Sequence, residues 1–185
     1  MSAKQNYIPA LLKIAMYYCE GFGTDQNFDE MYNSYKCAAD SGDSSAQYHL
    51  ANVMKNKIAP NQPYNGEIML QYLNLSADQE FRLSQCSLAK SYQTGDDGIR
   101  NYGEARRYLE LAAELGYDAA QCHLGACYYH GWFDIPVNKV KARQLNEQAA
   151  AQGNAEAMQA LSYSLISDHI HEHDRIHRTR RNALG

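Results

Sequence analysis

Small and apolar residues recur along this chain at the spacing of an α-helix. Near the start, Leu11, Ala15 and Tyr18 follow one another at intervals of four and three residues. Residues at such intervals lie on one face of a helix. The pattern predicts a helix from Ala10 to Glu20. A second apolar stretch predicts its antiparallel partner from Phe28 to Ser41.

This two-helix pattern repeats. One landmark is the small residue that opens each first helix, namely Ala10, Ala46, Ser84, Ala120 and Ala157. The other is a pair of small residues near the end of each second helix, namely Ala38-Ala39, Ser76-Ala77, Ala112-Ala113 and Ala149-Ala150. A constant period of this length is typical of helical-repeat solenoids. We therefore expect one solenoid domain over residues 1–185. Its expected parts are repeats at about 10–45, 46–83, 84–119 and 120–156, then a half-repeat and a cap rich in His and Arg at 157–185.

Two further columns mark the ends of the second helices. Asparagine is a favoured N-cap, and it precedes each of these helices, as Asn27, Asn65, Asn101 and Asn138. Glycine allows the left-handed conformation that ends a helix, and it follows three of them, as Gly42, Gly116 and Gly153. Glu80 interrupts the glycine column, so we expect the second repeat to end differently.

The repeated residues resemble those of the Sel1-like repeat family, a branch of the tetratricopeptide superfamily. The resemblance lies in an A-x-x-x-L-[GA]-x-x-Y-x-x-G run and a later A-x-x-x-x-x-x-A-A-x-x-G run. Repeat four supplies the full pattern, with Ala120, Leu124, Gly125, Tyr128, Gly131, Ala142, Ala149, Ala150 and Gly153. Repeat two departs from it, because Met54 replaces the tyrosine and Lys57 the glycine. The resemblance implies an all-α fold, a right-handed α-solenoid of antiparallel helix hairpins with a C-terminal helical cap.

The resemblance also implies where a partner binds. Family members serve as interaction scaffolds, and the first helix of each hairpin lines the concave side. The residues expected there are Lys13, Met16, Tyr48, His49, Asn52, Lys55, Lys90, Gln93, His123, Tyr129, His130 and Tyr163. The adjacent aromatic residues Trp132 and Phe133 lie in a loop, where they either anchor a partner or pack over neighbouring helix ends.

Composition narrows the possible functions. A net charge of −4 argues against a general nucleic-acid binder. No apolar run approaches the length of a membrane span. The first 21 residues lack the apolar core and cleavage site of a signal peptide, so we expect a cytoplasmic protein. The five cysteines are expected to be free thiols.

Candidate chemistry is sparse. The P-loop, the kinase motifs and the nucleophile elbow are missing, so we predict no enzymatic activity and no cofactor. His123, Cys127 and His130 share one side of a helix and could hold zinc, although the equivalents of Cys127 elsewhere favour packing. A denser group, His169, His171, His173 and His177, either binds a metal or belongs to a solvated cap. For both groups we favour the interpretation without a metal.

The function predicted from these observations is non-catalytic binding of a polypeptide in the concave groove. A more specific hypothesis is a cytoplasmic bacterial immunity protein that neutralises a toxin. One alternative is an adaptor or chaperone in a secretion or signalling complex. Another is a metal-responsive protein that works through the His-rich C-terminus.

Overall fold

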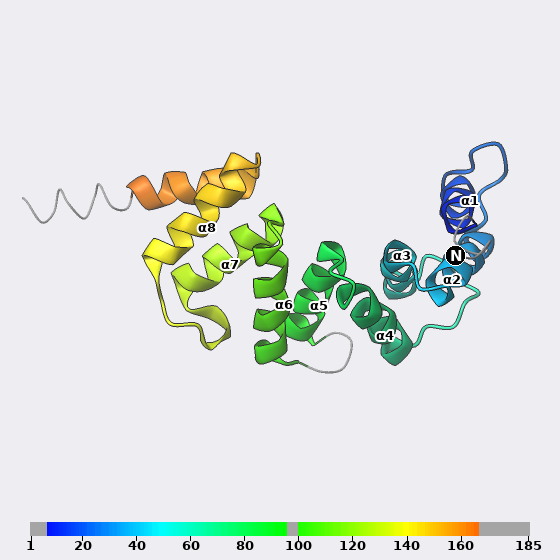
Figure 1. Ribbon diagram of the computed structural model, residues 1–185, viewed down its shortest axis with the longest axis horizontal. Helices are drawn as coiled ribbons and strands as arrows, with labels where there is room; N and C mark the ends of the chain where they lie inside the picture. Colours follow the sequence, from blue (N-terminus) through cyan, green and yellow to red (C-terminus); the bar gives the residue numbers. More distant parts are fainter. Residues whose placement is uncertain (1–6, 96–99, 167–185) are drawn as a thin grey trace, which may run out of the picture. The chain divides into compact units, whose positions relative to one another are not determined.

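The computed structural model describes residues 7–95 and 100–166, and across these ranges the regular secondary structure is helical (Figure 1). The elements are α1 (Ile8–Glu20), α2 (Phe28–Asp40), α3 (Ser44–Lys55), α4 (Gly66–Ala77), α5 (Arg82–Thr94), α6 (Tyr102–Glu114), α7 (Asp118–His130), the short 3₁₀ helix η1 (Trp132–Asp134) and α8 (Lys139–Ala151). Residues 155–166 are helical as well. The predicted all-α fold is confirmed, whereas the predicted C-terminal cap lies outside the described residues.

The described residues form two compact units, divided between Leu111 and Ala112 inside α6. In the first unit α1 packs on α2, α2 on α3, α3 on α4 and α4 on α5 (Figure 1). In the second unit α7 packs on α8. In each of these pairs, helices that follow one another along the chain are neighbours in space, as in antiparallel hairpins with short connections.

A leucine near the middle of successive first helices is a main core residue of each unit. Leu50 and Leu88 are fully buried in the first unit, and Leu124 is buried in the second. Leu161, at the same register, is half-buried. The alanines of the small pairs are buried too, apart from the half-buried Ala150, because a side chain of one carbon lets the helices approach closely.

The asparagine column does what the sequence predicts. Asn27, Asn65 and Asn138 have extended or non-helical backbones and accept hydrogen bonds from N–H groups in the first turns of α2, α4 and α8. Asn101 accepts a bond of 3.1 Å from the Glu104 N–H at the start of α6. Each cap satisfies backbone donors that have no partner inside the helix.

The expectation for Glu80 is wrong. Its φ is 60°, in the left-handed region that Gly42 and Gly116 occupy at the same register. The Glu80 N–H donates to the Ala77 carbonyl at 2.9 Å, as the Gly42 N–H donates to the Ala39 carbonyl at 2.9 Å. The second repeat therefore ends like the others, because the hydrogen bonds of the final turn dictate the backbone. The side chain bears the steric strain of that conformation.

A column of buried glutamines was not predicted. Gln47, Gln85 and Gln121 directly follow the opening small residue of their repeats and are almost fully buried. Each donates its side-chain N–H to the carbonyl of the second small-pair residue in the preceding repeat. The distances are 3.3 Å to Ala39, 3.4 Å to Ala77 and 3.2 Å to Ala113. Side chains with polar ends thus tie one repeat to the next, inside each unit.

In two of these three links, the side-chain oxygen of the buried glutamine also accepts a hydrogen bond. Gln79 donates to Gln47 Oε1 at 3.0 Å in the first unit, and Gln152 donates to Gln121 Oε1 at 2.9 Å in the second. Gln79 and Gln152 occupy the same register, two residues after the small pair. Among the described residues Gln85 has no such donor, and its buried Oε1 atom has no hydrogen-bond partner there.

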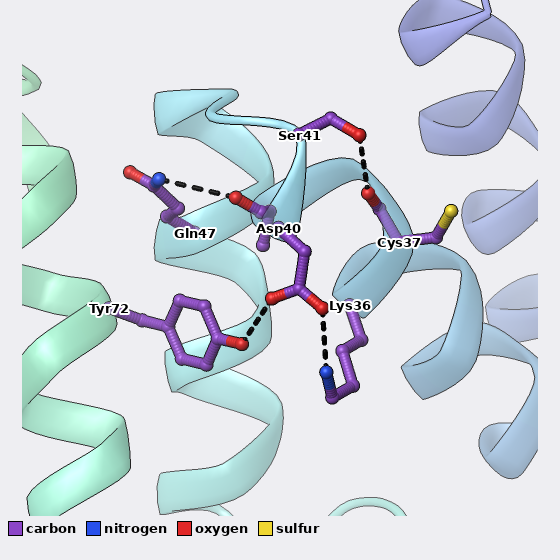
Figure 2. A network of polar contacts seen from close by, with 7 residues as sticks. Lys36, Cys37, Asp40, Ser41, Gln47 and Tyr72 are labelled. Atoms are coloured by element: carbon purple, nitrogen blue, oxygen red, sulfur yellow. Dashed lines mark hydrogen bonds and ion pairs between the residues drawn. The ribbon is translucent and has the colours of Figure 1, made fainter.

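Figure 2 shows a polar network that connects α2 to α4 next to Gln47. The Asp40 carboxylate accepts from Lys36 Nζ at 2.6 Å and from the Tyr72 hydroxyl at 2.6 Å. Burial acts to raise the pKa of Asp40, but the hydrogen bonds from Lys36 and Tyr72 outweigh it and lower that pKa. Burial, together with the bond to Asp40, raises the pKa of Tyr72 to about 12. The network is a structural contact between second helices.

Candidate functional site

A groove in the second unit, which we name the fourth-repeat groove, contains several of the expected binding residues. Its volume is about 300 Å³. It lies among α7, α8 and the helical residues 155–166. Its lining residues are Cys122, Ala126, Tyr129, His130, Lys139, Ala142, Arg143, Asn146, Ala160, Leu161, Tyr163 and Ser164.

The groove has an apolar floor and a cationic wall. The lining groups Ala126, Ala160 and Leu161 supply aliphatic surface from two first helices. Lys139 and Arg143 come from α8, four residues apart, so their side chains leave the same side of that helix. Both are held in place: Lys139 Nζ lies 5.4 Å from the centre of the Tyr129 ring, and Arg143 donates to Ser164 Oγ at 3.3 Å. Among the described residues that line the groove, none is an aspartate or a glutamate.

The rim of the groove carries a small aromatic stack. Tyr129 and His130 meet edge to face at 5.0 Å, and the Trp132 ring lies parallel to His130 at 4.9 Å. Trp132 remains 47% exposed. Exposed aromatic side chains held by ring contacts are suited to binding, since little conformational entropy is lost when a partner covers them.

Phe133 differs from Trp132 in its surroundings. Its ring lies 6.2 Å from His123, and it is half-buried. Phe133 and Asp134 also have positive φ values of 56° and 55°. Non-glycine residues in this region are strained, and such strain persists only where the surrounding structure holds it. Of the two interpretations of this aromatic loop, packing within the protein applies to Phe133, whereas the exposed Trp132 is accessible to a partner.

His123 is less accessible than expected for a residue on the binding face. It is half-buried, and burial lowers its pKa, opposed by the negative charge of Glu156. Cys127 in the next turn is fully buried, and burial raises its pKa to about 12. A thiol in this state is a poor metal ligand and a poor nucleophile.

In the first unit the expected binding residues differ in accessibility. Lys13, Met16 and Lys90 are exposed, whereas Asn52 and Gln93 are half-buried. Met16 is 50% exposed and gives α1 an apolar contact point. These residues could meet a partner without rearrangement.

Tyr48, His49 and Lys55 are already engaged within the protein. The His49 ring stacks on Tyr35 at 5.3 Å and meets Tyr48 at 5.3 Å. Tyr48 in turn lies 5.4 Å from Phe81. Burial lowers the pKa of His49, with the charge of Asp43 acting in the opposite direction. Lys55 Nζ donates to Ser91 Oγ at 2.8 Å. Substitutions at these three positions would disturb packing as well as any bound partner.

The inserted loop of repeat two forms a second concavity of about 260 Å³. Tyr32, Met54, Lys57, Pro60 and Tyr64 are among the residues that line it. The loop is tied to α2, because Asn61 and Gln62 both donate to the Asp29 carboxylate. This anchoring explains how two extra residues are accommodated without disturbing the helices.

In the part of the chain that the structure describes, no three His, Cys, Asp or Glu side chains converge as a metal site. His123, Cys127 and His130 do not form one. The group His169, His171, His173 and His177 lies outside the described residues. Over the same described part, no helix combines the length and the apolar character that crossing a membrane requires.

Sequence reasoning missed Lys139, Arg143 and Asn146, because it assigned binding to first helices and these residues lie on a second helix. A signal was present for Asn146. In the three preceding repeats its register holds Tyr35, Leu73 and Leu109, all of them buried. A polar residue in an otherwise apolar column marks a position with a different role.

Paired helices with a repeated register, buried small residues and an open groove define a helical-repeat scaffold. The chain belongs to the Sel1 repeat family, whose model matches residues 8–43, 82–117 and 118–154, more than half of the chain. The degenerate second repeat lies between the first two matches. Sel1 repeats mediate protein–protein interaction, so the fold is that of an interaction scaffold.

Relatives agree with this assignment. The chain is 26% identical, over 88% of its length, to chitin synthase regulatory factor 2 of Schizosaccharomyces pombe, of which it covers 33%. It spans about a third or less of the curated relatives it matches.

Solved structures share the fold. A Sel1 repeat protein from Oxalobacter formigenes has a TM-score of 0.75 at 24% identity, over 86% of this chain and 62% of that one. An immunity protein from Pseudomonas aeruginosa has a TM-score of 0.55 at 18% identity, over 83% of this chain and 56% of that one. Together with the family match, these likenesses confirm the predicted helical-repeat solenoid.

Proposed function

We propose that this protein is a non-catalytic scaffold that binds a polypeptide partner along the exposed face of its first helices. The observation that carries the proposal is the fourth-repeat groove. It combines Tyr129, His130 and Tyr163, which were expected on the binding face, with an aliphatic floor. Tyrosine and histidine offer an apolar body and a polar tip, which suits recognition of side chains and backbone together.

The partner we propose is a protein toxin, which this scaffold would neutralise by covering its surface. Support comes from the fold, because the neighbour from Pseudomonas aeruginosa is an immunity protein. Inhibition of this kind needs a complementary surface and no catalytic group. An adaptor role differs from it in having several partners, and the experiment below separates the two.

Affinity capture from the native cell, followed by mass spectrometry, tests the proposal. We compare the wild-type protein with Lys13→Glu/Lys90→Glu, which reverses two exposed charges on the proposed face. Lys55 is avoided because it bonds to Ser91. The double variant should weaken capture of the partner about tenfold, a typical effect of reversing charges at an interface.

The matched control is Lys36→Glu/Arg107→Glu, which makes the same change of charge on second helices. Both residues form exposed ion pairs with neighbours on their own helix. Lys36 also bonds to Asp40 in the network between α2 and α4, so circular dichroism must show that this control folds as the wild type does. Capture that is equal for the two double variants would rule out the first-helix face. One partner whose toxicity is suppressed by co-expression supports an inhibitor, whereas several unlinked partners contradict it.

A further inference from the structure

Among the described residues, α1 has extensive contacts with one neighbouring helix, whereas α3 has them with two. Figure 1 shows α1 at one end of the first unit, where it packs on α2. The later first helix α3 packs on its own partner α4 and also on α2, the second helix of the preceding repeat. The side of α1 that corresponds to the α2-facing side of α3 is therefore open in the described part of the chain.

The residues on this side of α1 are apolar and exposed. Ile14 is 38% exposed, Tyr17 is 43% exposed, and Ala10 is exposed as well. Phe22, which follows the helix, stacks on Tyr17 with 6.2 Å between the ring centres and is 71% exposed. We call these four residues the α1 face. In repeat two the registers of its three helical members are at most 5% exposed, and they hold Ala46, Leu50 and Val53.

An apolar outer face of this kind indicates an interface. End repeats of helical solenoids carry a polar outer surface, which keeps them soluble. The α1 face instead presents two aromatic rings and an isoleucine to solvent, and contiguous exposed apolar residues mark an interaction site. Tyr17 is larger than the residues at its register in the next three repeats, which are Val53, Ser91 and Cys127. The face therefore differs from one that receives a preceding repeat.

The charges beside the α1 face indicate what covers it. The charged residues of α1 are Lys13 and Glu20; both are exposed, and in the described part of the chain neither forms an ion pair. They are seven residues apart with Tyr17 between them, so the three side chains lie on one side of the helix. A second α1 that runs antiparallel, paired about Tyr17, places Lys13 of each copy beside Glu20 of the other. A parallel pair would place like charges together.

The apolar residues fit the same antiparallel register. When the two helices cross at Tyr17, the two Tyr17 rings meet at the two-fold axis. Ala10 of one copy then falls within one turn of Phe22 of the other, so the smallest residue of the face is close to an exposed aromatic ring. Each of these contacts occurs twice, because an interface about a two-fold axis uses the same surface on both copies.

We propose that the α1 face binds the α1 face of a second copy of this chain, as an antiparallel two-fold pair. Reciprocal ion pairs between Lys13 and Glu20 set the direction of the two helices. Tyr17 and Phe22 supply the apolar contact, as tyrosine often does at the centre of an interface. This inference goes beyond the proposed function, which concerns a different protein, and does not depend on it.

Sedimentation velocity of the full-length protein tests the inference at concentrations up to about 0.5 mM, where a dimer with a Kd of about 0.1 mM is mostly formed. The wild type should dimerise. Lys13→Glu and Glu20→Lys, each alone, should weaken the dimer about tenfold or more, because each change makes both reciprocal pairs repulsive. An equimolar mixture of the two variants should associate again, because one is then acidic at both positions and the other is basic at both.

Tyr17→Ser tests the apolar contact, and Ser91 shows that serine fits this register. The change should weaken the dimer about tenfold, as truncation of a tyrosine at the centre of an interface does. The controls are Val140→Ser, which removes a 70% exposed apolar side chain from α8, and Glu147→Lys, which reverses an exposed charge there. Both should dimerise like the wild type, and circular dichroism verifies that every variant is folded.

A wild type that stays monomeric would overturn the inference and leave the α1 face to a different protein. So would a dimer that Lys13→Glu and Glu20→Lys leave unchanged, or a mixture of these two variants that does not associate. A dimer that only the control variants weaken would place the interface in the second unit. Because Lys13 also lies on the proposed partner-binding face, partner capture is repeated with Tyr17→Ser, which should lose the dimer and still capture the partner.

Discussion

At the scale of single residues, the backbone overrides the side chain at two places in repeat two. Glu80 and Lys57 have φ values of 60° and 51°, although the family pattern calls for glycine at these registers. A side chain in the left-handed region costs about 1–2 kcal/mol per residue in steric repulsion. The fold tolerates this cost because the hydrogen bonds that close the preceding helices remain intact.

Replacing Glu80 with glycine should therefore stabilise the protein. We expect Glu80→Gly to raise the free energy of unfolding by about 0.5–1 kcal/mol, since relief of strain exceeds the added entropy of the unfolded chain. Urea denaturation followed by circular dichroism measures the change. The control is Gln71→Gly, an exposed position inside α4, which should lower stability by about 1 kcal/mol. If both variants lost the same free energy of unfolding, the backbone at Glu80 would not be strained.

At the scale of helices, buried glutamines link consecutive hairpins. Gln47 reaches from α3 to the last turn of α2 (Figure 2). Gln79, after α4, donates to Gln47. The link explains why a polar residue recurs in the core next to an alanine or serine. It also limits how the hairpins can slide, because a buried acceptor that loses its donor destabilises the structure.

A double-mutant cycle tests the link. Gln79→Leu should lower the free energy of unfolding by about 1 kcal/mol, because Gln47 Oε1 stays buried without its donor. In Gln47→Leu the loss should be smaller, because the exposed Gln79 can bond to water and the Ala39 carbonyl still accepts from the Gly42 N–H at 2.9 Å. Leucine also suits this register, which Leu11 fills in repeat one. The double variant should then show a coupling of about 0.5–1 kcal/mol. Additive losses in the cycle would mean that the two glutamines do not interact.

At the scale of the whole molecule, the two compact units contain different features. The first contains the two strained turns and the inserted loop, and the second contains the fourth-repeat groove. In helical repeats each hairpin contacts only its neighbours, so stability is a sum of local terms. A perturbation should accordingly be felt most in the unit that contains it.

Trp132 makes this measurable, because it is the only tryptophan in the chain and lies in the second unit. Leu50→Ala, in the first unit, should lower stability by about 2–5 kcal/mol and shift the urea transition seen by circular dichroism. The transition seen by Trp132 fluorescence should shift much less. Leu124→Ala, in the second unit, should shift the fluorescence transition strongly. Equal fluorescence shifts for the two variants would show that both units unfold as one.

Much of this protein could be predicted from the order of its residues. Helix positions, asparagine caps, the leucine column and the family follow from local rules, because spacing, capping and small-residue pairs act within one or two turns. Members of the groove on first helices, such as Tyr129 and Tyr163, could be named because the family resemblance places first helices on the binding side. The pattern failed at Glu80, where a backbone conformation persists without the residue that normally marks it.

Only the tertiary structure decided which side chains remain available. His49 and Lys55 were expected at a surface and are engaged by Tyr35 and Ser91, residues remote in sequence. Lys139, Arg143 and Asn146 joined the groove because α8 packs beside α7, which no local rule expresses. Periodicity determines which face a residue takes on its own helix, whereas the neighbouring helix determines whether that face is filled or open.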